Sequence, residues 1–459
     1  MTASITNDTI VAIATPPGRG GIGIVRLSGP DARCLLLPNL QLRSELAPGR
    51  ARYCTIVDAN ARLDEGVVTY FAAPNSYTGE DVLEVAAHGS PVILDLLVRR
   101  ALEAGARLAR PGEFTERAFL HGRIDLTQAE AVRDLIAAET LYQARVAAEQ
   151  LGGALSRRVA PVKEQLVELI TLLEAGIDFA EDDIDVTPDA EIARQLDVIA
   201  AGIAPMAASF REGRLVHSGL TMAIVGRPNA GKSSLFNRLV ERERAIVTAT
   251  PGTTRDLVTE RISLGGIPVE MVDTAGLRET TDEAELHGVA RTESAMADAD
   301  LVLLLLDATA TVDAGGVLRL PVEDAALLTS LEGRSPILVV NKIDLARPSR
   351  AEGIAAEVAE VSALTGEGVA ELRGRLLERV RGGANDAEGG MLTSLRHYEA
   401  LEGCAQALAR ARAGLDEQVP HEMLLLDLYS ALGQLDQLTG ATTADDILNR
   451  IFSSFCIGK

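Results

Sequence analysis

A glycine-rich stretch near the middle of the chain carries residue types that bind phosphate. Residues 226–233 read GRPNAGKS, which has the G-x-x-x-x-G-K-S spacing of a phosphate-binding loop. The β-like run TMAIV precedes it and the helical pattern SSLFNRLV follows it, as such a loop requires. The glycines allow backbone N–H groups to surround a β-phosphate, the Lys232 ammonium can neutralise β- and γ-oxygens, and the Ser233 hydroxyl can bind Mg²⁺. The pattern predicts a nucleoside triphosphate site.

Three further segments indicate that the nucleotide is GTP. The predicted strand IPVEMV ends at residues 273–276 (DTAG), where a carboxylate can hold the Mg²⁺ shell and a glycine N–H can meet the γ-phosphate. The predicted strand SPILVV ends at residues 341–344 (NKID). A carboxylate at Asp344 can accept two hydrogen bonds from guanine, whereas adenine lacks that donor edge. Residues 362–364 (SAL) fit the loop that closes over the base. Their order and spacing predict a GTPase domain.

Two other positions concern hydrolysis itself. Leu277 stands where Ras-like enzymes place the glutamine that orients the attacking water, and leucine has no acceptor for it. Glu285, in the acidic segment RETTDEAELHG, is our candidate for that role; the alternative is a solvated loop carboxylate. Residues 248–256 read TATPGTTRD, in which Thr254 can complete the Mg²⁺ shell and hold the γ-phosphate.

These motifs define the predicted nucleotide site. The catalytic candidates are Glu285 and Lys232, and the predicted Mg²⁺ ligands are Ser233 and Thr254. The predicted GTP-binding residues are Asn229, Ala230, Gly231, Lys232, Ser233, Ser234, Thr248, Ala249, Thr250, Pro251, Gly252, Thr253, Thr254, Asp273, Thr274, Ala275, Gly276, Asn341, Lys342, Asp344, Ser362, Ala363 and Leu364.

The elements that must position these residues indicate a multidomain α/β chain. Residues 1–120 alternate β-rich runs with turns and end in a helix that Ser90 could cap and Pro91 could begin, which predicts an α+β domain. Residues 121–214 have helical periodicity, residues 215–383 alternate strands and helices as a mainly parallel sheet requires, and residues 384–459 return to a helical pattern. The simplest interpretation is one helical domain interrupted by the GTPase domain; the alternative is two separate helical domains.

A second glycine-rich motif does not predict a nucleotide site. Residues 18–23 (GRGGIG) match the G-x-G-x-x-G dinucleotide fingerprint, but that fingerprint must open a helix. Here IGIVRLSGP continues as a strand and stops at a turn, so we expect a tight turn instead.

Composition excludes several classes of protein. The 459 residues, about three domains long, carry a formal net charge of −22, which disfavours non-specific binding to nucleic acid or to an anionic membrane. Aromatic residues make up 3% and Trp is absent, which disfavours a surface that stacks single-stranded bases. The four cysteines show no zinc spacing, and neither a signal peptide nor an apolar bilayer-spanning run is evident. We expect a cytoplasmic protein.

The C-terminal residues 456–459 (CIGK) superficially resemble a prenylation box. Such a box normally ends in Ser, Met, Gln, Ala, Leu or Phe and has basic residues upstream, whereas this one ends in Lys459 after an acidic stretch. We therefore expect Cys456 to be unprenylated. The alternative to a functional tail is a disordered end with an idle thiol.

Five stretches together resemble one known family. They are ATPPGRGGIGIVRLSG, NSYTGEDVLEVAAHGSPVIL, RPGEFTERAFLHGRIDLTQAEAV, the GTPase motifs and the terminal FCIGK. The chain is similar over its whole length to the MnmE (TrmE) family of tRNA-modification GTPases. The resemblance implies a homodimer built through the N-terminal domains, and paired GTPase domains. It also implies an FAD- and NADH-using partner, MnmG (GidA), in a heterotetramer or larger complex.

The same resemblance implies chemistry on tRNA. A carboxymethylaminomethyl or aminomethyl group would be placed on carbon 5 of the wobble uridine, with 5-formyl- or 5,10-methylene-tetrahydrofolate bound at the N-terminal domain. The matching folate positions are Arg26, Glu84, Arg123 (where Lys is common) and Lys459, with Cys456 beside them; Glu80 is a rival for Glu84, and ordinary surface pairing is the alternative for the arginines. The matching potassium positions are Asn229, Thr248, Thr250 and Thr253.

A rival reading is a GTPase switch that binds ribosomes or membranes without taking part in chemistry. A membrane switch would need a usable lipid signal, and a ribosome factor would need an appended basic RNA-binding module. The sequence shows neither feature.

Overall fold

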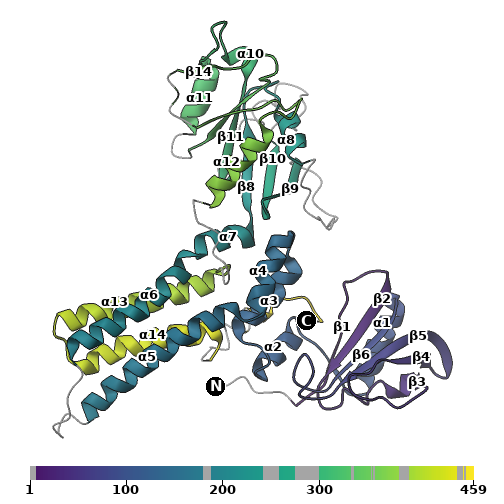
Figure 1. The fold of residues 1–459 in the computed structure, drawn as a ribbon. Helices are drawn as coiled ribbons and strands as arrows, with labels where there is room; N and C mark the ends of the chain where they lie inside the picture. The colour runs from purple at the N-terminus through teal and green to yellow at the C-terminus, as the bar shows by residue number, and fades with distance from the viewer. Residues whose placement is uncertain are drawn as a thin grey trace. The chain divides into compact units, whose positions relative to one another are not determined.

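The chain divides into two compact units, each described here by itself. The computed structural model describes residues 7–178, 188–240, 258–273, 299–331, 335–352, 354, 357–381, 392–441, 448 and 451–458. Unit 1 comprises Met1–Arg133, Gln150–Ile199 and Gly403–Lys459, and unit 2 comprises Asp134–Glu149 and Ala200–Glu402 (Figure 1).

Unit 1 contains a seven-stranded sheet of order β3-β4-β5-β6-β2-β1-β7. Neighbouring strands pair antiparallel except β1 and β7, which are parallel. The strands are β1 (Ile10–Ile13), β2 (Gly20–Ser28), β3 (Leu40–Leu42), β4 (Arg52–Asp58), β5 (Ala61–Phe71), β6 (Val82–Gly89) and β7 (Arg107–Leu108), with a 3₁₀ turn at Leu37–Asn39.

Helix α1 (Pro91–Glu103) packs on this sheet through an apolar stripe. Leu94, Leu97 and Ala101 share one face at helical spacing and join the buried core of β-strand side chains. The helix begins at Pro91 with Ser90 at the N-cap position, as the sequence predicts, although the Ser90 side chain makes no capping hydrogen bond. The fixed φ of proline favours the first helical position without a cap.

The glycine-rich residues 18–23 lead into strand β2, and no helix follows them. A Cβ atom at Gly23 would lie 2.4 Å from a Leu94 methyl, so glycine is needed there for close packing of β2 on α1. The prediction that this motif is not a dinucleotide fingerprint is therefore confirmed by the course of the chain.

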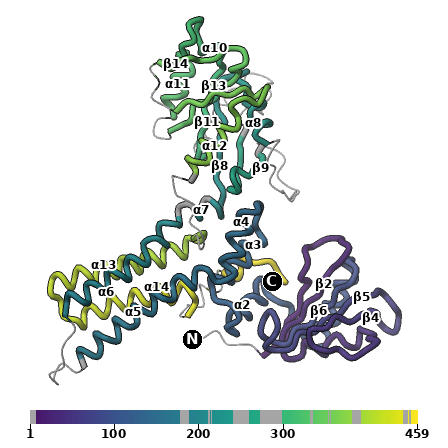
Figure 2. Tube along the Cα trace, in the orientation of Figure 1, coloured from purple at the N-terminus to yellow at the C-terminus, as the bar shows by residue number. Residues whose placement is uncertain are grey.

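Long helices make up the rest of unit 1. Helices α5 and α14 lie side by side (Figures 1 and 2), and Lys163 Nζ lies 2.5 Å from Asp436 Oδ1 between them. The helices are α2 (Glu113–Leu120), α3 (Leu126–Ala137), α4 (Leu141–Leu151), α5 (Ala154–Asp178), α6 (Asp189–Ala208), α13 (Leu395–Asp416) and α14 (His421–Thr439), of which α3, α4, α6 and α13 continue into unit 2.

The end of the chain packs back onto the start of the helical part. Ile451, Phe452 and Phe455 are buried against Leu126 and Ala129 of α3. A Cβ atom at Gly112, just before α2, would lie 2.6 Å from the Phe452 carbonyl oxygen, so the two segments are in direct contact. Residues 451–458 thus form part of unit 1.

Unit 2 contains a six-stranded sheet of order β15-β13-β11-β8-β10-β9, parallel except for the edge strand β9. Its strands are β8 (Leu220–Val225), β9 (Val258–Leu264), β10 (Ile267–Asp273), β11 (Leu301–Asp307), β13 (Ile337–Asn341) and β15 (Val358–Glu360); β12 (Val317–Leu318) and β14 (Arg350–Ala351) form a separate pair. Its remaining helices are α7 (Phe210–Ser218), α8 (Lys232–Val240), α10 (Ala308–Thr311), α11 (Val322–Ser330) and α12 (Val369–Arg381).

Both faces of this sheet are buried. In β11, Leu303 and Leu305 join the core that includes α8 and α12, whereas Leu304 and Leu306 join the opposite core, to which α11 contributes. Parallel strands covered on both sides need continuous apolar runs, which is why LVLLLL reads without polar interruption. The predicted fold class, an α+β N-terminal part, a helical part and a P-loop GTPase domain with a mainly parallel sheet, is confirmed; the exact domain bounds remain a prediction.

Within unit 2, the turn between α3 and α4 packs against the β9–β10 hairpin. Thr140 Oγ1 donates a hydrogen bond to the Gly266 carbonyl at 2.6 Å, and Glu139 pairs with Arg261 of β9. Gly266 has φ +93°, and a Cβ atom there would lie 2.5 Å from the Tyr142 Cβ. Glycine is required both by the backbone conformation and by the contact.

Among the described residues, no helix combines the length and the apolar character needed to cross a membrane.

We predict that Gly266→Ala lowers the free energy of unfolding by about 2 kcal/mol, because a left-handed residue with a side chain is strained and the new methyl meets Tyr142. Urea denaturation followed by circular dichroism measures this. Gly374→Ala in α12 is the matched control: its Cβ would meet nothing within 4 Å, so we expect a gain of about 0.5–1 kcal/mol. Equal effects of the two substitutions would contradict the contact.

Candidate functional site

The phosphate loop joins β8 to α8 through a backbone that needs glycine. Gly226 has φ +151° and Gly231 has φ +94°, and Asn229 lies in the left-handed region at φ +64°. A Cβ at Gly226 would lie 2.3 Å from the Leu305 carbonyl oxygen, and one at Gly231 would lie 2.3 Å from Asn341 Nδ2. The loop is therefore held close against β11 and β13 and opens onto the first turn of α8, where the N–H groups of a helix N-terminus favour an anion.

Lys232 lies inside the concave side of this loop. Its ammonium donates hydrogen bonds to the carbonyl oxygens of Gly226 at 2.8 Å and Arg227 at 3.0 Å. Ser233, the next residue, is exposed at the start of α8. A cation and a hydroxyl at a helix N-terminus are the groups that phosphate oxygens and their Mg²⁺ require.

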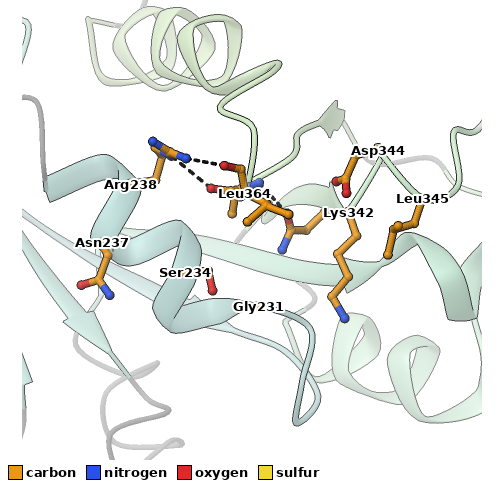
Figure 3. Close-up of a pocket in the computed structure, with 10 residues that line it drawn as sticks. Gly231, Ser234, Asn237, Arg238, Lys342, Asp344, Leu345 and Leu364 are labelled. Carbon is orange, nitrogen blue, oxygen red and sulfur yellow. Dashed lines mark hydrogen bonds between the residues drawn. The ribbon is translucent and has the colours of Figure 1, made fainter.

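Next to this loop lies an open pocket of about 280 Å³ (Figure 3). It is lined by the end of the phosphate loop, one face of α8 and the loops that follow β13 and β15. The lining residues are Gly231, Ser234, Asn237, Arg238, Asn341, Lys342, Asp344, Leu345, Ala363 and Leu364. The structure thus brings together predicted site residues that lie more than 130 positions apart.

Asn341 ties three segments of the pocket to one another. It is the last residue of β13, and it is 2% exposed. Its Nδ2 donates to the Ala230 carbonyl at 2.8 Å, and its Oδ1 accepts from the Ala363 N–H at 2.9 Å. The phosphate loop and the 362–364 loop are therefore fixed relative to each other by a single side chain.

Asp344 is oriented by Ser362. The Ser362 hydroxyl donates to Asp344 Oδ1 at 2.6 Å, and Ser362 itself is fully buried. A carboxylate held in this way at a pocket wall can accept hydrogen bonds from the N1–H and 2-amino groups of guanine.

Lys342 forms an ion pair that we did not predict from the sequence. It has φ +66°, and its ammonium lies 2.5 Å from Asp307 Oδ2 at the end of β11. Asp307 Oδ1 in turn accepts from the Thr309 N–H at 2.9 Å. Burial opposes ionisation of Asp307, but the hydrogen bonds from Lys342 and Thr309 outweigh it and lower the pKa of this carboxyl group. Asp307 ends a parallel strand at the same sheet edge as the pocket. Its position at the carboxyl end of that strand could have identified it as a site residue from the sequence.

Arg238 is a second residue that our sequence reasoning missed. Its Nε donates to the Ala363 carbonyl at 3.0 Å, and its Nη2 donates to the Leu364 carbonyl (Figure 3). It lies four residues after Ser234 on α8, so the two share a helix face, and that spacing was the available signal.

Several predicted residues lie outside the described part of the chain. Asp273 is the last residue of β10, which runs parallel to β8, so the chain reaches the same sheet edge as the phosphate loop. The predicted residues outside the described segments are Thr248, Ala249, Thr250, Pro251, Gly252, Thr253, Thr254, Thr274, Ala275, Gly276, Glu285 and Lys459; Leu277 also lies outside them. Their roles stay predictions. Within the described segments, no group of three or more His, Cys, Asp or Glu residues could hold a metal ion.

In unit 1, Arg26 and Glu84 form a partly buried ion pair between β2 and β6. The two residues are opposite each other in the register, and Arg26 Nη2 lies 2.7 Å from Glu84 Oε1. The Arg26 guanidinium lies 5.7 Å from the ring centroids of both Tyr77 and Phe114. Glu80 belongs to a different network, because it accepts hydrogen bonds from Arg117 and Ser28.

The C-terminal tail lies beside the Arg26–Glu84 ion pair. Arg26 Nη1 donates to the Gly458 carbonyl at 3.3 Å, and the Gly112 N–H donates to the Cys456 carbonyl at 3.4 Å. Cys456 is exposed. Arg123 is in the same region, since a Cβ at Gly79, two residues from Tyr77, would lie 3.3 Å from Arg123 Cγ. Arg26, Glu84 and the tail are thus neighbours in unit 1, and Arg123 lies against Gly79 in the segment that carries Tyr77.

Comparisons with known proteins cover the whole chain. The family described as "MnmE helical domain" matches residues 126–456, and that described as "GTP-binding protein TrmE N-terminus" matches residues 9–123. A protein of Koribacter versatilis named "tRNA modification GTPase MnmE" is 58% identical over 458 residues, 99% of each chain. One of the same name from Nitrosomonas europaea is 46% identical over 99% of this chain and all of its own.

Among solved structures, the G domain of the T. maritima FeoB iron transporter is 28% identical over 35% of this chain and 97% of its own, with a TM-score of 0.25. A score of that size adds nothing to the fold described above. The two family matches and the full-length relatives agree with each other and with the pocket. The chain belongs to the MnmE (TrmE) family of tRNA modification GTPases.

Proposed function

We propose that this GTPase works on tRNA with an FAD-dependent partner of the MnmG (GidA) type. Together they would add a carboxymethylaminomethyl or aminomethyl group to carbon 5 of the wobble uridine of certain tRNAs. The observation that carries the proposal is the pocket that Asn341 and Asp344 line beside the phosphate loop, in a chain similar over 99% of its length to proteins named tRNA modification GTPases.

For GTP, different described residues would bind the two ends of the nucleotide. Lys232 and the N–H groups at the start of α8 would hold the phosphates, and Asp344 would select guanine. Mg²⁺ would be held by Ser233 and Thr254, with Asp273 near its shell. Hydroxyl and carboxylate oxygens are ligands that this ion prefers, and the ion would supply positive charge beside the β- and γ-phosphates.

A potassium ion is the second proposed metal. Asn229 would hold it together with Thr248, Thr250 and Thr253, all of which can offer oxygen atoms. Asn229 is exposed on the phosphate loop in a left-handed conformation, so its side chain does not serve the packing of the loop. A cation at that place would supply the charge that an arginine finger supplies in other GTPases, and it would favour pairing of two GTPase domains.

Tetrahydrofolate, as the 5-formyl or 5,10-methylene form, is the proposed one-carbon donor. Arg26, Glu84, Arg123 and Lys459 would hold it. The neighbourhood suits such a ligand, because basic groups can pair with an anionic tail, a carboxylate can accept from a pterin, and the exposed ring of Tyr77 supplies an aromatic face. Arg26 and Glu84 already pair with each other, so the ligand has to share or replace that ion pair.

We further propose a cytoplasmic homodimer that forms a heterotetramer or larger complex with its partner. The net charge of −22 agrees with a protein that leaves most tRNA contacts to that partner. The rival function, a switch acting on ribosomes or membranes without chemistry, has no described feature in its favour.

The test of this proposal is nucleoside analysis of tRNA from a deletion strain. We expect the modified wobble uridines to disappear and to return when the wild-type gene is supplied. Unchanged wobble uridines in the deletion strain would favour the switch function instead.

Expressing the Cys456→Ser variant in the deletion strain tests the role of the tail separately from that of the GTPase site. We predict that wobble-uridine modification falls while GTP hydrolysis by the purified variant stays near the wild-type rate, because the tail lies in unit 1 beside Arg26 and the nucleotide pocket lies in unit 2. Normal modification, or a prenyl adduct in the intact mass of the wild-type protein, would contradict this role.

We predict that GTP hydrolysis is about tenfold faster or more in potassium than in sodium, a barrier difference of about 1.4 kcal/mol. Steady-state rates at matched ionic strength measure it. Asn229→Ala should remove the difference between the two salts. Equal rates for the wild-type protein would remove the potassium assignment.

We predict that Glu285→Ala lowers the single-turnover rate of GTP hydrolysis and leaves nucleotide affinity unchanged, because this residue would act on water and not on GTP. Glu283→Ala, two positions away in the same acidic segment, is the control and should hydrolyse GTP normally. A rate within about twofold of wild type, under ~0.4 kcal/mol of barrier, would mean that another group orients the water.

A further inference from the structure

Besides local hydrogen bonds, such as that from the Gly366 N–H to the Ser362 carbonyl, the loop that would cover the base is held by contacts of two kinds. Ser362 bonds Asp344 and Ala363 bonds Asn341, so these contacts come from the 341–344 segment that itself belongs to the pocket. The other contact comes from α8. There the Arg238 guanidinium donates to two successive backbone carbonyls, those of Ala363 and Leu364.

The two residues that carry these carbonyls differ in exposure, since Ala363 is buried. Leu364 is 77% exposed, although it lines the pocket. Apolar packing therefore does little to fix this residue, and its place depends on hydrogen bonds to the backbone. A charged donor bound to two neighbouring carbonyls restrains both the position and the orientation of the loop.

Arg238 also connects the two ends of the nucleotide site. Helix α8 begins at Lys232, and Arg238 lies six residues further along, a rise of about 9 Å. The helix that presents Lys232 and Ser233 to the phosphates thus presents Arg238 to the base loop. Arg238 lies too far along the helix for its side chain to bind the phosphates. Its guanidinium bonds the carbonyl oxygens of the loop, so we do not assign it a hydrogen bond to the base.

We propose that Arg238 is a positioning residue for guanine-nucleotide binding: it fixes the 362–364 loop over the base at a set distance from the phosphate loop. The proposal rests on the assignment of this pocket to a guanine nucleotide. It adds a residue outside the recognised nucleotide motifs, and the group it acts through is the backbone of Ala363 and Leu364.

The proposal predicts a loss confined to the base end of the ligand. In Arg238→Met, which keeps a long apolar stem, we expect GDP to dissociate about tenfold faster, as expected when hydrogen bonds to a charged group are lost. Competition by inorganic triphosphate, which has no base, should stay within about twofold of wild type. Arg238→Lys should restore part of the slow dissociation.

A comparison of GDP with IDP distinguishes positioning from direct reading of the base. Hypoxanthine lacks only the 2-amino group, which Asp344 would recognise. Arg238→Met should weaken GDP and IDP equally and so preserve their affinity ratio, whereas Asp344→Asn should reduce that ratio. A merely structural defect in unit 2 would also weaken inorganic triphosphate and lower the midpoint of thermal unfolding.

Arg347→Met is the matched control. Arg347 pairs with Glu367 at 2.5 Å near the same loop but does not bond the carbonyls of Ala363 or Leu364, so this variant should keep wild-type dissociation. Unchanged GDP dissociation in Arg238→Met, or an equal loss of inorganic triphosphate, would overturn the positioning role. Failure of the wild-type protein to bind GDP at all would instead overturn the proposed function, and the positioning role with it.

Discussion

The buried amide of Asn341 is the interaction on which the nucleotide pocket depends. It satisfies the Ala230 carbonyl of the phosphate loop and the Ala363 N–H of the base loop with one side chain. Without it, both backbone groups would lose their partner, at a cost of about 1–3 kcal/mol each. Its Nδ2 would lie 2.3 Å from a Cβ at Gly231, so the position of this amide leaves room only for glycine there. The parallel sheet makes this possible, because the carboxyl ends of β8 and β13 meet at one edge.

The nucleotide pocket could be predicted from the sequence because its signals are local. Glycines at 226 and 231, a lysine before a helix, and polar segments directly after apolar strands each predict their own structure. The parallel order of strands then brings residues such as Ser233, Asp344 and Ser362 to one side of the sheet. Family resemblance supplied what periodicity cannot, namely the tRNA substrate and the partner. The Ser90 side chain makes no hydrogen bond at its N-cap position, which shows the limit of local rules even for a helix whose start is correctly predicted.

Other features could not be predicted, because they are contacts between distant segments made by residues with ordinary surface character. The spacing of Arg238 from Ser234 indicates only a shared helix face, and the fold alone shows that Arg238 bonds a loop 125 positions away. The contact of Gly458 with Arg26, 432 positions earlier, likewise depends on apolar packing of Phe452 and Phe455 against α3. Such contacts carry no sequence period. They link the tail to the proposed folate residues and the base loop to the helix of the phosphate site.

We infer that the loops joined by Asn341 form a pocket that recognises guanine through the Asp344 carboxylate. Calorimetric binding of GDP, ADP and xanthosine diphosphate to the wild-type protein and to Asp344→Asn tests it most directly. Xanthine carries a carbonyl in place of the 2-amino group, so an amide at position 344 should suit it better than a carboxylate does. We expect the wild-type protein to bind GDP and not ADP, and the variant to prefer xanthosine diphosphate to GDP. Equal binding of ADP and GDP by the wild-type protein, or an unchanged preference for GDP in the variant, would contradict it.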